Sequence, residues 1–124
     1  MPTIGVSVAV TPDAGFVSTD GAHGAASIDE VRDAMRAYDG GLAALAPPSA
    51  PRHLITVSDD PYRPQPRWDR STEDGMSTVV GRIRADGALD NGVKYVLLSH
   101  NTKMGAAKGA VLMGELMKYD GLIG

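Results

Sequence analysis

The stretch from Ser99 to Ala107 (SHNTKMGAA) has the residue types best suited to contacting a ligand. It leads from an apolar run, Val93 to Leu98, into a segment of helical spacing that opens with small residues. Free backbone amides at a helix start, with the positive end of the helix dipole, favour an anion or a polar ligand. Asn101 and Thr102 could instead cap the helix ahead of tight helix–sheet packing, the commoner role of these residue types. Spacing alone leaves both interpretations open.

A second distinctive stretch, Arg63 to Arg70 (RPQPRWDR), carries three arginines and the only tryptophan on a backbone stiffened by prolines. Guanidinium groups bind carboxylates and phosphates bidentately, so this stretch could bind an anion or a partner. The alternative is a loop in which at least two of the arginines pair with nearby carboxylates. Those carboxylates are Asp59, Asp60, Asp69 and Glu73.

The chain of 124 residues contains no cysteine, which excludes disulfides, thiolate metal ligands and a cysteine nucleophile. Its three histidines lack metal-ligand spacing, so no metal site is expected. His23 lies in a loop-like segment without an orienting partner and receives no catalytic role. His53 is expected to be structural, while His100, beside Asn101, is better placed to line a site. No serine-nucleophile motif, dinucleotide fingerprint or phosphate-binding loop is present, so no residue is assigned a catalytic role.

The length of 124 residues predicts one small domain over residues 1–124, and its net charge is −3. Its 12 basic residues are spread out, which argues against nucleic-acid binding. No apolar run reaches the roughly 20 residues needed to span a bilayer, and no secretion signal is visible. We therefore expect a cytoplasmic protein without nucleic-acid or membrane partners.

The apolar patterning predicts an α+β fold with a mixed or antiparallel sheet and flanking helices. The most secure helix begins at Ser27-Ile28-Asp29-Glu30, which has the form of a capping box, and is expected to end at Gly40-Gly41. Two long loops are expected, at Thr11–Ala26 and Asp59–Gly75. The remaining expected elements are strands at Ile4–Val10, His53–Val57, Ser77–Arg84 and Val93–Leu98, and a helix at Thr102–Tyr119.

Four stretches, in order and at similar spacing, resemble aspartate-semialdehyde dehydrogenases of the fungal and archaeal type. They are Ser49-Ala50-Pro51, Arg63 to Arg70, Val80-Gly81-Arg82-Ile83-Arg84, and Ser99-His100-Asn101-Thr102 with Gly105-Ala106-Ala107. With the Val6-Ser7-Val8 strand, the resemblance covers nearly the whole chain. It implies the glyceraldehyde-3-phosphate-dehydrogenase-like carboxy-terminal domain, which serves dimerisation and substrate binding.

The resemblance implies NADPH-dependent reduction of aspartyl phosphate to the semialdehyde, on the pathway to lysine, threonine and methionine. In that chemistry a cysteine thiolate forms a thioacyl intermediate, a histidine is its acid–base partner and arginines hold the substrate. The family's NADP-binding domain and cysteine lie upstream of every matched stretch, and its histidine just before the strand matching Ile4–Val10. His23 does not stand in that motif and inherits no role.

The resemblance assigns cofactor-binding positions to Asn101, Thr102 and Gly105. Asn101 matches a polar side chain near the nicotinamide end of NADP, while Thr102 and Gly105 match capping and close-packing residues of the same motif. The chain departs from the family at Trp68, where Leu is usual, and at Lys108, where a small residue is usual.

These features lead to the hypothesis that the chain is the carboxy-terminal part of such an enzyme and is inactive alone. NADP would bind the intact enzyme and not this chain by itself, and an apolar sheet face would form a homodimer. The last helix, which in the family packs towards the absent NADP-binding domain, would then expose its Gly- and Ala-lined face. The alternative is a stand-alone, non-catalytic dimeric binding module that partners a separate nucleotide-binding subunit. A different family sharing the same domain type fits less well, because of the Arg63 to Arg70 stretch.

Overall fold

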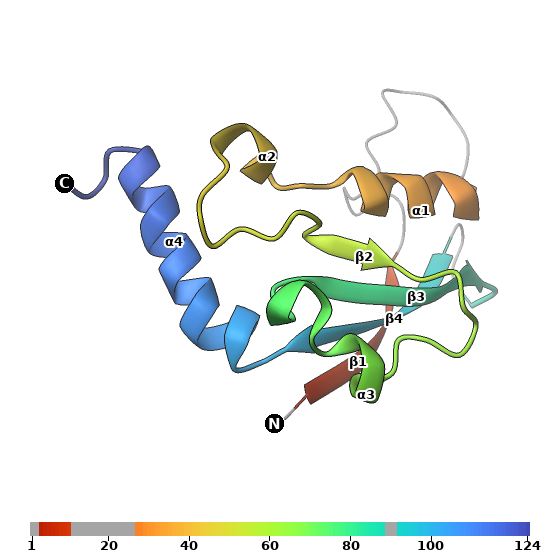
Figure 1. Cartoon of the computed structure of the whole chain (residues 1–124). Coiled ribbons are helices and arrows are strands. Elements are labelled where there is room, and N and C mark those ends of the chain that lie inside the picture. The colour runs from red at the N-terminus through yellow and green to blue at the C-terminus, as the bar shows by residue number, and fades with distance from the viewer. Residues whose placement is uncertain (1–2, 11–26, 89–91) are drawn as a thin grey trace.

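The computed structural model describes residues 3–10, 27–88 and 92–124, with side chains from Ser27 onwards. The described residues form a four-stranded sheet in the order β1–β4–β3–β2. Helices α1 (Ile28–Ala37) and α2 (Leu42–Leu45) lie along one side of it, and the last helix extends away from the sheet end (Figure 1). The elements are β1 (Thr3–Val10), α1 (Ile28–Ala37), α2 (Leu42–Leu45), β2 (Ile55–Val57), α3 (Pro66–Asp69), β3 (Thr78–Asp86), β4 (Gly92–His100) and α4 (Lys108–Tyr119).

The sheet is mixed, which confirms the predicted α+β class. β4 lies at its centre and pairs antiparallel with both β1 and β3, whereas β2 pairs parallel with β3. Within this register Thr3 lies opposite His100 and Val80 opposite Leu97. The end of β4 is therefore fixed by a neighbouring strand just where the chain enters the Ser99–Ala107 stretch.

A β-bulge interrupts β3 between Gly81 and Arg84. Gly81 pairs with Val96 and Arg84 with Lys94, so two residues of β3 lie opposite one residue of β4. The inserted residue shifts the alternation of side chains, and Ile83 consequently joins Val80 on the face that meets α1. The bulge thus places Val80 and Ile83, whose spacing in the sequence does not follow the regular alternation of a strand, on the one face that packs against α1.

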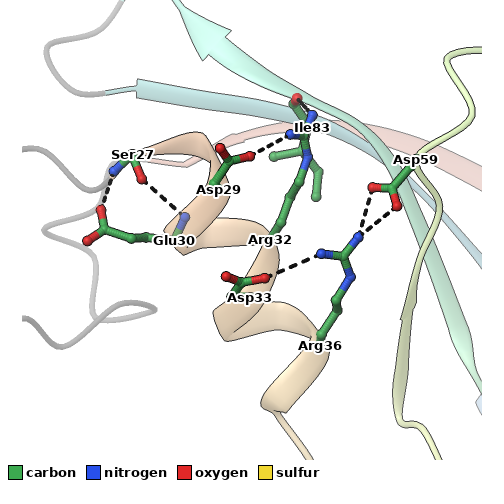
Figure 2. A network of polar contacts seen from close by, with 8 residues as sticks. All are labelled: Ser27, Asp29, Glu30, Arg32, Asp33, Arg36, Asp59 and Ile83. Atoms are coloured by element: carbon green, nitrogen blue, oxygen red, sulfur yellow. Dashed lines mark hydrogen bonds and ion pairs between the residues drawn. The ribbon is translucent and has the colours of Figure 1, made fainter.

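α1 is held at its start by the predicted capping box (Figure 2). The Glu30 amide donates to Ser27 Oγ at 3.2 Å, and the Ser27 amide donates to Glu30 Oε2 at 2.6 Å. Further along, the Arg36 guanidinium reaches Asp59 at 2.8 Å, which joins α1 to the segment after β2. The helix is therefore anchored both locally and to a distant part of the chain.

The main core lies between α1 and the sheet. Its buried members are Val31, Met35, Val80, Ile83 and Val93. Val31 and Met35 are four residues apart, so they lie on one face of the helix. Fully burying such side chains contributes about 1.5–3 kcal/mol each, and this core fixes α1 across the sheet.

A second cluster holds α4. Leu112 of α4 packs with Leu42 and Met76, and Leu116 lies against them. Glu115 adds a polar contact, because its carboxylate accepts from the amide of Ser49 at 2.9 Å and from its hydroxyl at 2.7 Å. One face of α4 is therefore packed within this chain. No helix in the described part of the chain is long and apolar enough to cross a membrane.

The other face of α4 is open to solvent, as expected from its small and apolar residues. Ala106, Ala107 and Ala110 are exposed, and so are the larger apolar side chains further along. Val111 is 55% exposed, Met113 58% and Met117 37%. A helix fully packed in a single domain buries such residues, so this face is unpartnered within the described chain.

The expected end of the first helix and the expected second long loop need correction. α1 ends at Ala37, before the glycine pair, and Gly40 and Gly41 instead lead into the short helix α2, which was not predicted. The expected Asp59–Gly75 loop contains α3 and a tight turn at Thr72–Gly75. Helices this short carry too few apolar repeats to be distinguished from loops by periodicity. The expected Thr11–Ala26 loop lies outside the described residues.

Candidate functional site

The junction of β4 with the last helix is built around His100, which is only 4% exposed. Its Nδ1 accepts a hydrogen bond from the Lys103 amide at 3.3 Å and lies 3.2 Å from the hydroxyl of Thr102. An Nδ1 that accepts carries no proton, so the neutral ring is protonated on Nε2. The histidine therefore satisfies a free amide at the start of the helix, a role that the sequence had suggested for Asn101 or Thr102.

Asn101 directly follows this histidine. Its side-chain oxygen Oδ1 is buried and has no hydrogen-bond partner among the described residues. An amide oxygen deprived of both water and a donor costs about 1–3 kcal/mol. Asn101 thus carries a hydrogen-bond acceptor that is covered by the chain and has no donor among the described residues.

Gly105 belongs to a π-helical turn at Lys103–Ala107 that precedes α4. Thr102 occupies the position before the turn, but its hydroxyl faces His100 and makes no capping bond to the turn. Gly105 is exposed, and a Cβ added there would meet only the His100 carbonyl oxygen at 3.6 Å and the Asn101 Cβ at 3.8 Å. Close packing inside this chain does not require Gly105, so its small size leaves the outer side of the turn open.

The turn at Thr72–Gly75 lies against the same junction. Glu73, Asp74 and Gly75 all have positive φ, at 47°, 57° and 78°. A Cβ at Gly75 would come within 2.8 Å of the Lys103 side chain and 3.1 Å of the His100 ring, so only glycine fits there. We refer to Thr72–Gly75 as the left-handed turn.

The Glu73 and Asp74 carboxylates of the left-handed turn contact different parts of the chain. The Glu73 carboxylate accepts from the amides of Arg52 and His53 and lies 2.7 Å from His53 Nδ1. Burial alone would raise the pKa of Glu73, but these hydrogen bonds hold it below its usual value. His53 is therefore structural, as predicted, while His23 lies outside the described residues.

Asp74 points the other way, towards the last helix. Lys103 Nζ donates to its Oδ1 at 2.6 Å, and Lys108 Nζ donates to its Oδ2. The hydrogen bonds from Lys103 and Lys108 lower the pKa of Asp74 to about 2. The sequence identified Lys108 only as an unusual residue at its position. The sequence analysis did not identify Asp74, because its contacts with Lys103 and Lys108 depend on a left-handed backbone that no local sequence pattern predicts.

The Arg63–Arg70 stretch divides into a paired and an unpaired part. Arg63 forms an ion pair with the buried Asp69, which also accepts from the Gln65 amide at 2.6 Å. The hydrogen bond to Asp69 raises the pKa of Arg63. Arg67 and Arg70 are exposed, and no ion pair joins either of them to the described residues. The expectation that at least two of the three arginines pair is therefore wrong.

An open groove of about 470 Å³ lies beside the junction, and its lining residues include Arg52, Glu73, Asp74 and Lys108. None of Asn101, Thr102 and Gly105 lines it. Among residues 27–88 and 92–124, no group of three or more His, Asp or Glu side chains is arranged to hold a metal ion. The structure thus brings the three candidate cofactor residues together at one turn, apart from this groove.

Comparison with known proteins places these features in context. Residues 16–104 match the family model described as semialdehyde dehydrogenase, dimerisation domain. The chain is 46% identical over 90 residues to the aspartate-semialdehyde dehydrogenase of Methanothermobacter thermautotrophicus, an alignment that covers 73% of this chain and 26% of that enzyme. It is 43% identical over 99 residues to the Candida albicans enzyme, covering 80% and 27% of the two chains.

The fold comparison agrees with the sequence comparison. The crystal structure of the Candida albicans aspartate-semialdehyde dehydrogenase with NADP matches with a TM-score of 0.70 and 41% identity. That match covers 83% of this chain and 28% of the enzyme. The chain therefore spans about a quarter of the length of the relatives it matches.

Proposed function

Because the chain belongs to the semialdehyde dehydrogenase dimerisation-domain family, we propose that it supplies the dimerisation and substrate part of an NADP-dependent aspartate-semialdehyde dehydrogenase. The observation that carries this proposal is the match to the dimerisation-domain model over residues 16–104. Two copies of the chain would form the homodimer, and a nucleotide-binding domain outside residues 1–124 would complete the active site.

The chain on its own is proposed to be inactive. Acyl transfer through a thioester needs a thiolate, and none of the 124 residues is cysteine. His100 is buried and engaged by Lys103 and Thr102, which suits a structural role better than proton transfer. The nucleophile would come from the remaining three-quarters or so of the enzyme, judged by the length of the relatives.

Asn101 is the residue proposed to meet the cofactor. Its Oδ1 is covered and lacks a donor in the described chain. We propose that the side chain turns outward when NADP binds and accepts from the carboxamide NH2 of the nicotinamide. NADPH, when bound, supplies the hydride for the reduction. Thr102 and His100 would hold Asn101 in place from within the chain, and Gly105 would leave room beside it.

The exposed face of α4 is proposed to pack against the nucleotide-binding domain. Val111, Met113 and Met117 form this face together with Ala110, while Leu112 on the opposite side is buried in the chain's own second cluster. A helix with apolar residues on two sides is typical of one shared between two domains.

Reconstitution tests the proposal. The purified chain is studied by light scattering, by calorimetric titration with NADP, and by assaying NADPH formation from aspartate semialdehyde and phosphate. The rest of the Candida albicans enzyme is then added as a separate polypeptide, with that enzyme's own matching segment as the positive control. We expect a dimer without turnover from the chain alone, and turnover after addition.

Each other outcome has a definite meaning. Turnover by the chain alone contradicts the proposal, because no thiol is present to form the thioester. A dimeric chain that fails to restore activity, where the Candida albicans segment succeeds, favours the stand-alone binding module instead. The variant Met113→Glu provides a matched test of the interface: it should weaken reconstitution while leaving the dimer of the chain alone intact.

A further inference from the structure

The ion pairs of Asp74 depend on the π-helical turn. In a regular α-helix two residues five positions apart point about 140° away from each other. In a π turn the hydrogen bonds span five residues, so positions 103 and 108 come to lie nearly above each other. The π turn thus brings Lys103 and Lys108 towards one side of the helix, where both contact the Asp74 carboxylate.

The π turn is defined by its backbone hydrogen bonds and is permitted by a glycine. The Ala107 amide donates to the Thr102 carbonyl at 3.1 Å, and the Lys108 amide donates to the Lys103 carbonyl, which are the wider bonds of such a turn. A Cβ at Gly109 would overlap the carbonyl oxygen of Met104, so any other residue there would disturb this geometry. The glycine permits the turn but does not by itself hold it.

The positive charges of Lys103 and Lys108 destabilise the π turn unless an anion compensates them. Two lysines at the beginning of a helix repel each other and also face the positive end of the helix dipole. The Asp74 carboxylate lies between their ammonium groups and compensates both effects. Single exposed ion pairs contribute little, but one carboxylate bracketing both ends of the same turn restrains its length and register.

The carboxylate is presented by a strained backbone. Glu73 and Asp74 both adopt the left-handed conformation that residues other than glycine avoid. Glu73 is fixed there by Arg52 and His53, and Gly75 lies directly against His100 and Lys103. The left-handed turn is thus tied to the segment before β2 on one side and to the β4 junction on the other.

We infer that Asp74 is a positioning residue, which holds the π turn through Lys103 and Lys108 and thereby sets the position of Asn101. This inference rests on the proposed contact between Asn101 and the cofactor. Asn101 and Thr102 connect the buried His100 to the π turn, so a change in the register of the turn moves the Asn101 side chain.

The experiment compares Asp74→Asn with Asp59→Asn in the full 124-residue chain. Asp59 is also exposed and paired, with Arg36 of α1, so the control removes the same charge away from the turn. Amide hydrogen exchange and the Asn101 side-chain resonances are followed by NMR. Asp74→Asn should speed exchange at Ala107 and Lys108 roughly twofold to tenfold, as for lost ion pairs, and should shift the Asn101 signals. Asp59→Asn should do neither.

Two variants of Lys108 test the same inference in case Asp74→Asn fails to fold. Lys108→Met should reproduce the faster exchange, and Lys108→Arg, which keeps the charge, should restore slow exchange. Unchanged exchange in both Asp74→Asn and Lys108→Met would overturn the inference. Faster exchange with unmoved Asn101 signals would also overturn it, because Asp74 would then restrain the turn without positioning Asn101.

Cofactor affinity separates this inference from the proposed function. In the reconstituted enzyme, Asp74→Asn should raise the KM for NADP several-fold while changing kcat less, and Lys108→Arg should leave both near their original values. If the unsubstituted assembly does not bind NADP, the proposed function fails, whatever the exchange data show. If it binds NADP and Asp74→Asn leaves the KM unchanged, the positioning role fails alone.

Discussion

Arg32 of α1 donates a hydrogen bond from Nη2 to the carbonyl oxygen of Ile83 at 3.2 Å, across 51 positions of sequence (Figure 2). Ile83 belongs to the β-bulge of β3, where regular pairing with β4 is interrupted. A bulge leaves backbone groups without their ladder partners. The guanidinium therefore supplies a donor at a place where the sheet cannot, and it couples the position of α1 to the bulge.

Replacing Arg32 by methionine should destabilise the fold by about 1–2 kcal/mol, because the carbonyl of the buried Ile83 loses its donor while the aliphatic stem is kept. Urea unfolding of the chain measures this change. Asp29→Asn is the matched control, since Asp29 pairs with Arg32 through the other nitrogen, Nη1, and is largely exposed. Its effect should stay within about 0.5 kcal/mol, and equal losses from both variants would contradict the role of the Ile83 contact.

Two glycines of α4 should respond oppositely to alanine. At Gly109 a Cβ would overlap the Met104 carbonyl oxygen, so Gly109→Ala should destabilise the chain by roughly 1–3 kcal/mol. At Gly114 a Cβ meets nothing within 4 Å, so Gly114→Ala should stabilise the helix by about 0.5–1 kcal/mol. Thermal and urea unfolding of the two variants give the comparison. If both substitutions raised the free energy of unfolding, the close approach of Gly109 to Met104 in the π turn would not be required for a stable fold.

Local patterns were sufficient for the elements whose causes are local. The capping box at Ser27 and Glu30 and the apolar spacing of Val31 and Met35 placed α1, because both act within a few residues. Alternation of apolar and small residues placed β1, and a continuous apolar run placed β4. Motif spacing then identified the family, which the comparisons confirm.

The remaining features have causes that lie far apart in the sequence. The bulge becomes visible only when Gly81 and Arg84 are set against β4. The π turn is permitted by the close approach of Gly109 to Met104, and on a regular helix Lys103 and Lys108 would point apart. The capping role of His100 was likewise hidden, since a histidine side chain rarely serves as a helix cap.

Acid should weaken the fold through carboxylates whose pKa lies below its ordinary value. The pKa of Asp74 falls to about 2 because of Lys103 and Lys108, and that of Asp86 falls because of the Ala88 amide and Lys94. Groups with depressed pKa stabilise fully above their unfolded-state value, near 3.8 for Asp, and lose this contribution as the pH falls through the folded-state value. Stability should therefore decline as the pH falls from about 4 to about 2.

Urea midpoints measured across this range test the decline. Asp74→Asn removes one of the titrating groups, so its midpoint should fall less steeply than that of the unsubstituted chain. Asp59→Asn is the control, because it removes an exposed carboxylate that pairs with Arg36, away from Lys103 and Lys108, and its curve should run parallel to the original. A curve for Asp74→Asn that is as steep as the original would show that the Asp74 ion pairs do not stabilise the fold.

Replacing Asn101 should separate stability from cofactor binding. Because Oδ1 is buried without a donor, Asn101→Leu removes an unsatisfied acceptor, and the free energy of unfolding should be unchanged or should rise by up to about 1–2 kcal/mol. In the reconstituted enzyme the same variant should raise the KM for NADP roughly tenfold, the effect of about 1.4 kcal/mol of lost hydrogen bonding. Thr102→Val, which removes a hydroxyl facing His100, is the neighbouring control, and its cost should appear in stability first. A destabilised Asn101→Leu with normal NADP affinity would assign Asn101 to the fold and remove it from the cofactor site.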